Sequence, residues 1–360
     1  MVRRSLAAYA GKKVLITGNT GFKGSWLTLW LRSLGASVHG YSIDIPTRPS
    51  LYKIAGIKVP MVWGDVADIP KIARAVKKIR PDIVFHLAAQ PLVRSSYREP
   101  IETHRVNVMG SAAVLEAVRQ CPVVRAVVMI TTDKVYENSG HGRPFKETDP
   151  LGGYDPYSAS KAAAEIMIAS YRSAYFNAAF YKRKHRTLIA SARAGNVIGG
   201  GDFAKDRLIP DCLRAFGKGR PVPIRNPQAV RPWQHVLEPL AGYLQLGERL
   251  LRGDVDCADA WNFGPGDRDA RPVHWVVKCL AEKWGRDAAF TIDRREHPHE
   301  ADHLRLDITK AREYLAWRPR WSNATALAKV VDFHKAWRKK EDMRKVCLAQ
   351  IEGYARACEK

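Results

Sequence analysis

Short apolar runs alternate with longer amphipathic stretches through the first half of the chain. The apolar runs predict strands at residues 12–17, 37–43, 83–87 and 126–131. The longer stretches repeat their apolar positions every three or four residues, which predicts helices at 25–34, 69–79 and 102–119. Strands that alternate with helices are typical of an α/β fold with a doubly wound parallel sheet.

This rhythm changes near residue 202. Prolines then become frequent and the predicted elements become short. The change predicts a first domain over residues 1–190, which holds the sheet, and a smaller lobe formed mainly by residues 191–360. We expect some segments of the second half to return to the first domain.

Composition narrows the class of protein. With 360 residues, 46% of them hydrophobic, the chain can bury one large core or one core and a smaller lobe. No run approaches the roughly 20 apolar residues that cross a bilayer, so we predict no membrane association and a cytoplasmic location. The six cysteines are scattered without a metal-ligand spacing, which predicts reduced thiols and no metal site.

The formal net charge of +23 suits a nucleic-acid binder, an anionic surface or a small polyanionic substrate. The densest basic runs, residues 181–186 and 337–340, do not alternate with aromatic residues in the way that stacking platforms require. These runs are therefore interpreted as solvated surface. Nucleic-acid binding remains an alternative of another class, and the favoured partner is a small molecule.

A glycine turn stands between the first predicted strand and helix. Gly18, Gly21 and Gly24 allow a tight turn and close approach of the backbone to a pyrophosphate, which the N-terminus of the helix attracts. Asp44 ends the next strand, where an acid can bind ribose hydroxyls, so we predict a Rossmann-type domain that binds NAD. Arg48 keeps NADP open, and Asp65 is either an adenine contact or a turn residue. The predicted cofactor-binding set is Gly18, Thr20, Gly21, Phe22, Gly24, Asp44, Asp65, Val66, Leu87, Ala88, Ala89, Tyr157 and Lys161.

Tyr157 and Lys161 lie one helical turn apart after an N-cap candidate, Asp155, and a proline, Pro156. A phenol with a pKa of about 10 is a poor base at neutral pH, and a nearby lysine cation favours its phenolate. Tyr157 can then take a proton from a sugar hydroxyl while hydride leaves the same carbon for nicotinamide. The motif alone is weak evidence, but it follows a dinucleotide-binding turn.

Several segments together carry a family resemblance that extends over nearly the whole chain. They are residues 17–24, 86–91, 132–138, 152–157, 193–202, 224–227 and 231–235. With these segments the chain resembles the extended short-chain dehydrogenases/reductases of the NAD-dependent epimerase/dehydratase type, and more narrowly the CDP-glucose 4,6-dehydratases. The triplet Thr132-Asp133-Lys134 and the segment 231–235 are the narrower of these motifs.

The resemblance implies conversion of CDP-glucose to CDP-4-keto-6-deoxyglucose and water. It implies that Thr132 hydrogen-bonds the oxygen at C4 and that Asp133 and Lys134 serve the elimination between C5 and C6. The chemistry is consistent, because oxidation at C4 makes the C5 hydrogen acidic, and hydride then returns to C6 so that NAD is regenerated. A nucleotide-sugar 4-epimerase, or a 4,6-dehydratase for another nucleotide hexose, remains the alternative.

The second lobe must neutralise the diphosphate of such a substrate, for which arginine is well suited. The resemblance implies substrate contacts by Asn196, Arg207, Arg231, Arg305 and Arg94. Tyr97 is a further candidate for the hexose side of the site. Asn107 is expected instead to have a structural role in holding the helix that carries it. The family also implies a homodimer, or a dimer of dimers, through the helices near 102–119 and 157–175. Departures from the family pattern are the short segment 139–148, Phe203 and His303, all near the expected substrate side.

Overall fold

The computed structural model describes residues 6–138, 140, 142–266, 269–285, 288–293 and 304–358. Its centre is a seven-stranded parallel sheet with the strand order β11-β6-β5-β4-β1-β2-β3. The strands are β1 (Lys13–Thr17), β2 (Ser37–Ser42), β3 (Met61–Trp63), β4 (Ile83–His86), β5 (Ala126–Ile130), β6 (Leu188–Ala194) and β11 (Ala260–Phe263). The predicted doubly wound Rossmann-type sheet is confirmed.

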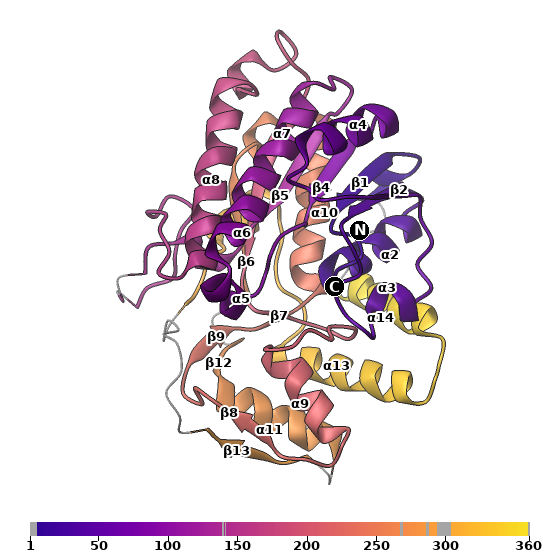
Figure 1. Ribbon diagram of the computed structural model, residues 1–360, viewed down its shortest axis with the longest axis vertical. Helices are drawn as coiled ribbons and strands as arrows, with labels where there is room; N and C mark the ends of the chain where they lie inside the picture. Colours follow the sequence, from indigo (N-terminus) through magenta and orange to yellow (C-terminus); the bar gives the residue numbers. More distant parts are fainter. Residues whose placement is uncertain are drawn as a thin grey trace.

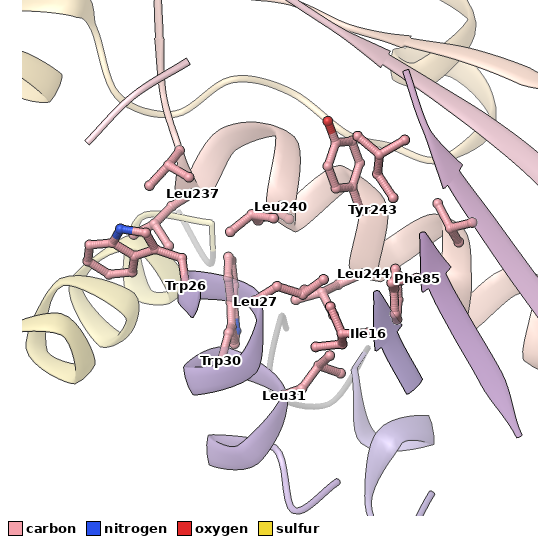
Figure 2. Packing of buried hydrophobic residues seen from close by; sticks show 14 of the residues in the cluster. Ile16, Trp26, Leu27, Trp30, Leu31, Phe85, Leu237, Leu240, Tyr243 and Leu244 are labelled. Atoms are coloured by element: carbon pink, nitrogen blue, oxygen red, sulfur yellow. The ribbon is translucent and has the colours of Figure 1, made fainter. Parts of the chain in front are cut away.

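Helices cover both faces of this sheet (Figure 1). One face packs on α4 (Ile69–Ile79), α7 (Gly110–Arg119) and α8 (Pro156–Ala174) through a core that includes Leu15 and Val84. The other face packs on α2 (Phe22–Ser33) and α10 (Leu237–Arg252). Figure 2 shows Trp26, Leu27 and Trp30 of α2 against α10. Alternate residues of each strand supply the two cores, because side chains on a strand point to opposite faces.

The second half of the chain divides between the sheet and a smaller lobe. Here β8 (Val222–Ile224) pairs with β13 (Phe290–Ile292), and β9 (Val230–Pro232) pairs with β12 (Ala270–Pro272). Two short strands, β7 (Val197–Ile198) and β10 (Gln234–His235), also pair, and α9 (Leu208–Phe216), α11 (Val273–Trp284) and α13 (Asn323–Arg338) enclose a separate apolar core. By contrast, α10 and β11 belong to the sheet layers, and β6 spans residue 190. The division at 190/191 therefore stays a prediction.

The helix predicted over residues 102–119 is interrupted. It consists of α6 (Pro100–His104), the π-helical turn η2 (Arg105–Met109) and α7. The wider turn directs Asn107 inward, where its amide donates to the Gln90 carbonyl (3.1 Å) and the Ser160 hydroxyl (2.9 Å) and accepts from the Gln90 N–H (2.9 Å). Asn107 thereby joins this helix to the loop after β4 and to α8, so its structural role is the one observed.

A buried carboxylate on α10 holds the C-terminal segments through hydrogen bonds. Glu238 accepts hydrogen bonds from the backbone N–H of Trp321 (2.7 Å) and of Arg320 (3.1 Å). It also accepts one from the hydroxyl of Tyr354 (2.5 Å) on α14 (Met343–Ala357). Burial raises the pKa of Glu238 to about 7. None of the described helices is long and apolar enough to cross a membrane.

Candidate active site

A cavity of about 890 Å³ opens at the carboxyl ends of the strands, between the sheet and the smaller lobe. This is where open α/β sheets bind ligands. Its lining combines the glycine turn, the ends of β2, β4 and β5, the start of α8, and residues of the second half. The predicted site residues along it are Gly18, Thr20, Gly21, Phe22, Gly24, Asp44, Asp65, Val66, Leu87, Ala88, Ala89, Arg94, Thr132, Asp133, Lys134, Tyr157, Lys161, Asn196, Arg207 and Arg231.

The glycine turn leaves no room for side chains. Gly18 has φ +74°, and a Cβ there would lie 2.7 Å from the backbone nitrogen of Ala88. A Cβ on Gly24 would lie 2.2 Å from the carbonyl oxygen of Gly18. Because α2 begins at Phe22 rather than at Ser25, its first N–H groups belong to the turn itself. This cradle fits a pyrophosphate, as expected for NAD.

The two aspartates predicted for the cofactor differ in their surroundings. Asp44 is exposed on the cavity wall, its backbone oxygen accepts from the Thr20 hydroxyl (2.6 Å), and its carboxylate has no partner among the described residues. It is thus available to ribose hydroxyls. Asp65 accepts from the Ala67 N–H (2.9 Å) and from Arg105 (2.5 Å), so its carboxylate already serves a turn and an ion pair.

The triplet after β5 places a carboxylate in the cavity wall. Thr132 caps a 3₁₀ turn over Asp133–Val135, and its hydroxyl donates to Oδ1 of Asp133 (3.1 Å). Oδ2 of Asp133 is buried and has no hydrogen-bond partner among the described residues. Burial raises the pKa of Asp133, and the Lys134 cation opposes the rise. A carboxyl group of this kind can hold a proton at a higher pH than a solvated aspartate, which suits an acid-base role.

Tyr157 and Lys161 reach the same place from α8. Asp155 caps the helix by accepting from the Ser158 N–H (3.0 Å), as predicted, and Pro156 opens it. Burial raises the pKa of Tyr157 to about 12, and a hydrogen bond with Thr132 opposes the rise. Burial lowers the pKa of Lys161 to about 8, and the Glu165 carboxylate opposes this change.

Among the described residues, Lys161 does not hydrogen-bond the Tyr157 hydroxyl. The Lys161 ammonium donates to the carbonyl oxygen of Ile130 (3.3 Å), and the side chain whose hydrogen bond favours the Tyr157 phenolate is that of Thr132. The desolvation of a buried phenol outweighs this contact. Thr132 therefore links Tyr157 to Asp133 through its hydroxyl.

Of the arginines predicted to bind substrate from the second lobe, Arg207 and Arg231 line the cavity and Arg305 does not. Arg231 is buried in β9 and donates to the Val230 carbonyl (3.2 Å), and Arg207 donates to Asp202 (2.9 Å). Arg305, in contrast, does not line the cavity, and its guanidinium donates to the backbone oxygen of Gly142 (2.6 Å).

The remaining residues predicted for the substrate side differ in whether they line the cavity. Arg94 lines the cavity and pairs with Asp206 at 3.4 Å, whereas Tyr97 does not line it. Phe203 lines the cavity and packs on Trp337 with ring centroids 5.0 Å apart. His303 lies outside the described residues, as do positions 139 and 141 of the short segment.

Sequence reasoning missed Lys23 among the charged residues of the cavity. Lys23 stands between Phe22 and Gly24 in the glycine turn and lines the cavity beside Asp133, Lys161 and Arg207. The sequence alone could have identified it, because Lys23 is the one charged residue among the eight residues 17–24.

Comparison with known proteins supports this reading of the geometry. The chain matches the family model for GDP-mannose 4,6 dehydratase over residues 15–330. It is 49% identical to a CDP-glucose 4,6-dehydratase of Salmonella typhimurium, over 97% of this chain and 98% of the relative. A dTDP-glucose 4,6-dehydratase of Streptomyces antibioticus is 29% identical, over 90% and 93% of the two chains.

A solved structure extends the likeness to the fold. The UDP-glucose 4-epimerase of Thermus thermophilus in complex with NAD superimposes with a TM-score of 0.75 at 25% identity, over 90% of this chain and 99% of the other. The resemblance stated from the motifs is confirmed by these findings. The chain belongs to the GDP-mannose 4,6 dehydratase family of nucleotide-sugar enzymes.

Proposed function

We propose that this protein is an NAD-dependent CDP-glucose 4,6-dehydratase, a hydro-lyase that forms CDP-4-keto-6-deoxyglucose. The observation that carries the proposal is the Asp133 carboxyl, whose Oδ2 has no partner among the described residues, in the cavity that also holds Tyr157. The identity of 49% to a CDP-glucose 4,6-dehydratase supports the choice of nucleotide and sugar.

The first step is oxidation at C4 of the hexose. Tyr157 takes the proton of the C4 hydroxyl, and Thr132 hydrogen-bonds the same oxygen as it becomes a ketone. The glycine turn and Asp44 would hold NAD, which would supply the hydride acceptor for this oxidation and the hydride donor for the later reduction at C6. Lys161 adds positive charge beside the developing oxyanion.

The second step is the loss of water between C5 and C6. The C4 ketone makes the C5 hydrogen acidic, so one group must take that proton and another must donate a proton to the leaving C6 hydroxyl. Asp133 and Lys134 supply these two functions, and the raised pKa of Asp133 allows it to donate. A proton would return to C5 as C6 is reduced, and the net change is the loss of one water molecule.

The diphosphate is bound by the second lobe. Arg207, just before α9, and Arg231 of β9 line the cavity, and a guanidinium pairs with two phosphate oxygens at once. Asn196 and Arg94 complete the substrate side of the wall. Arg305 lies apart from these residues, because its guanidinium donates to the backbone oxygen of Gly142.

A second candidate function is a nucleotide-sugar 4-epimerase, which the structural neighbours favour. An epimerase needs Tyr157 but has no use for an elimination pair. The deciding experiment incubates the purified protein with CDP-glucose, dTDP-glucose, UDP-glucose and GDP-mannose and assays 4-keto-6-deoxy products by mass spectrometry. A product lighter by one water from CDP-glucose supports the proposal, and an isomer of unchanged mass supports the epimerase.

We also propose that the protein assembles as a homodimer through α6 and α8. These helices pack together and leave Ile101 82% and Ile166 59% exposed. Apolar side chains on neighbouring helices are typical of an interface between copies. Ile101→Glu and Ile166→Glu together should shift the mass measured by light scattering from dimer to monomer. A monomeric wild type would contradict the proposal.

A further inference from the structure

A buried ion pair between α8 and β6 lies next to the triplet 132–134 but outside the lining of the cavity. The guanidinium of Arg193 donates to Oε2 of Glu165 (2.9 Å), and each of the two residues is 3% exposed. Neither of them lines the cavity. Removing two charges from water is costly, and hydrogen bonds to their other atoms offset part of this cost. The further partners of the pair therefore show which segments it connects.

The Glu165 carboxylate holds the residue just before the triplet. Its Oε1 accepts from the hydroxyl of Thr131 (2.5 Å), and its Oε2 also accepts from the hydroxyl of Ser191 on β6 (2.7 Å). Thr131 follows β5 directly and is the neighbour of Thr132. The carboxylate thus joins the end of β5 to α8 and β6 at the point where the triplet begins.

The Arg193 guanidinium holds the residue just after the 3₁₀ turn that contains Asp133. It donates to the hydroxyl of Tyr136 (2.8 Å), which donates in turn to Oδ1 of Asn262 on β11 (2.7 Å). The Tyr136 ring stacks on that of Phe145, with centroids 4.9 Å apart and planes within 8°. Tyr136 is 2% exposed and does not line the cavity. Its place is therefore fixed on the hydroxyl and on the ring.

Asp133 lies between these two anchored residues and has few hydrogen bonds of its own. Its Oδ1 accepts from Thr132, and its Oδ2 has no hydrogen-bond partner among the described residues. The position of the carboxyl group in the cavity wall therefore depends largely on the backbone that carries it. That backbone is held on one side at Thr131 and on the other at Tyr136, and both contacts lead to the same ion pair.

We propose that the ion pair of Glu165 and Arg193 is a positioning unit for the elimination step, because it holds both ends of the triplet 132–134. Tyr157, which is assigned to the oxidation at C4, is held elsewhere: its backbone N–H donates to the Ser96 hydroxyl (3.1 Å). Loss of an anchor should therefore slow the loss of water more than the oxidation. This inference deepens the proposed function and rests on it.

Tyr136→Phe is the sharpest test, because it removes one anchoring hydroxyl, keeps the ring and leaves the cavity lining intact. Stopped-flow absorbance follows a single turnover of the full chain with NAD⁺ and CDP-glucose. We expect water loss to slow by roughly 10- to 100-fold, because a displacement of about 1 Å is enough to cost about 100-fold in rate. Reduced nicotinamide should form at nearly the wild-type rate and then build up, with KM unchanged. Thr131→Val removes the other anchoring hydroxyl and should act in the same direction.

Hydrogen–deuterium exchange adds a measurement that needs neither cofactor nor substrate. Peptides that cover residues 131–136 should exchange faster in Tyr136→Phe than in the wild type, because the turn has lost one of its two anchors. Tyr9→Phe is the matched control, since it removes another buried hydroxyl, one that donates to the Leu244 carbonyl (2.7 Å). It should change neither the exchange of these peptides nor the rate of either step.

The outcomes separate the inference from the proposed function. Equal slowing of oxidation and water loss in Tyr136→Phe, or a rate of water loss equal to that of Tyr9→Phe, would overturn the inference while the proposed function stands. Slower water loss without faster exchange at residues 131–136 would also overturn it, because the hydroxyl would then act by another route. A wild type that forms no 4-keto-6-deoxy product would overturn both.

Discussion

The hydroxyl of Thr132 donates a hydrogen bond to Oδ1 of Asp133 (3.1 Å), and the same side chain lowers the pKa of Tyr157 against the effect of burial. One side chain thus connects the group assigned to oxidation at C4 with the group assigned to elimination at C5 and C6. Because Thr132 and Asp133 are adjacent just after β5, their side chains can act at two neighbouring positions of the cavity. The consequences can be measured step by step.

Asp133→Asn should separate oxidation from elimination. The amide has nearly the same shape but cannot exchange a proton, so the rate of water loss should fall by roughly 10²- to 10⁴-fold. Oxidation at C4 should persist and be seen as reduced-nicotinamide absorbance that builds up in a single turnover. Asp332→Asn, at an exposed position on α13, is the matched control and should turn over normally. Unchanged turnover of Asp133→Asn would refute the elimination role.

Tyr157→Phe should stop the reaction before any cofactor is reduced. The ring remains, so packing and nucleotide affinity should be preserved, while the base for the C4 hydroxyl is lost. We expect kcat to fall by roughly 10²- to 10⁴-fold, with little change in the dissociation constant for CDP-glucose. Stopped-flow absorbance of the cofactor is the measurement. Rapid appearance of reduced cofactor in this variant would show that another group is the base.

Gly24→Ala should abolish the cofactor cradle. The added Cβ would lie 2.2 Å from the Gly18 carbonyl oxygen, so the turn must shift or the helix must move. We expect destabilisation of about 1–3 kcal/mol and a large loss of NAD affinity. Gly353→Ala on α14 is the control, because a Cβ there meets nothing within 4 Å and alanine favours a helix by up to about 1 kcal/mol. Normal NAD binding by Gly24→Ala would contradict the cradle.

Glu238 should make stability depend on pH. Burial raises its pKa from 4.5 to about 7, so between these values the folded chain holds a proton that the unfolded chain has released. The contribution of this group to stability is therefore full below pH 4.5 and is lost as pH rises to about 7, by roughly 3 kcal/mol.

Urea unfolding at about pH 5 and about pH 8 provides the measurement, with Glu238→Gln as reference. The difference in unfolding free energy between wild type and variant should shift against the wild type at the higher pH. The comparison cancels all other titrating groups. A difference that is the same at both pH values would show that Glu238 titrates as a solvated acid.

The features that could be predicted from the sequence are those formed by residues that lie close together along the chain. The glycine turn, Asp44 and the triplet 132–134 each follow one strand, and Tyr157 and Lys161 lie one turn apart in α8, so local spacing identifies them. Helix starts and ends were less certain: α2 begins at Phe22, three residues before the predicted start.

The remainder depends on contacts between distant segments. The π-helical turn at Asn107 is set by Gln90 and Ser160, which lie 17 and 53 residues away in sequence. The environment of Lys23 depends on Tyr243 and Arg207, and the contact of Arg305 depends on Gly142. No periodicity reports such pairs, because each arises only when segments distant in sequence come together in the fold.

Two of the hydrogen bonds to Glu238 can form only late in the synthesis of the chain. Their donors are the N–H of Trp321 and the hydroxyl of Tyr354, 83 and 116 residues later in the chain. While the ribosome is still making those residues, the carboxyl group of Glu238 lacks these two donors. The buried hydrogen bonds of Glu238 can therefore be complete only after Tyr354 has been made, later than every strand of the sheet.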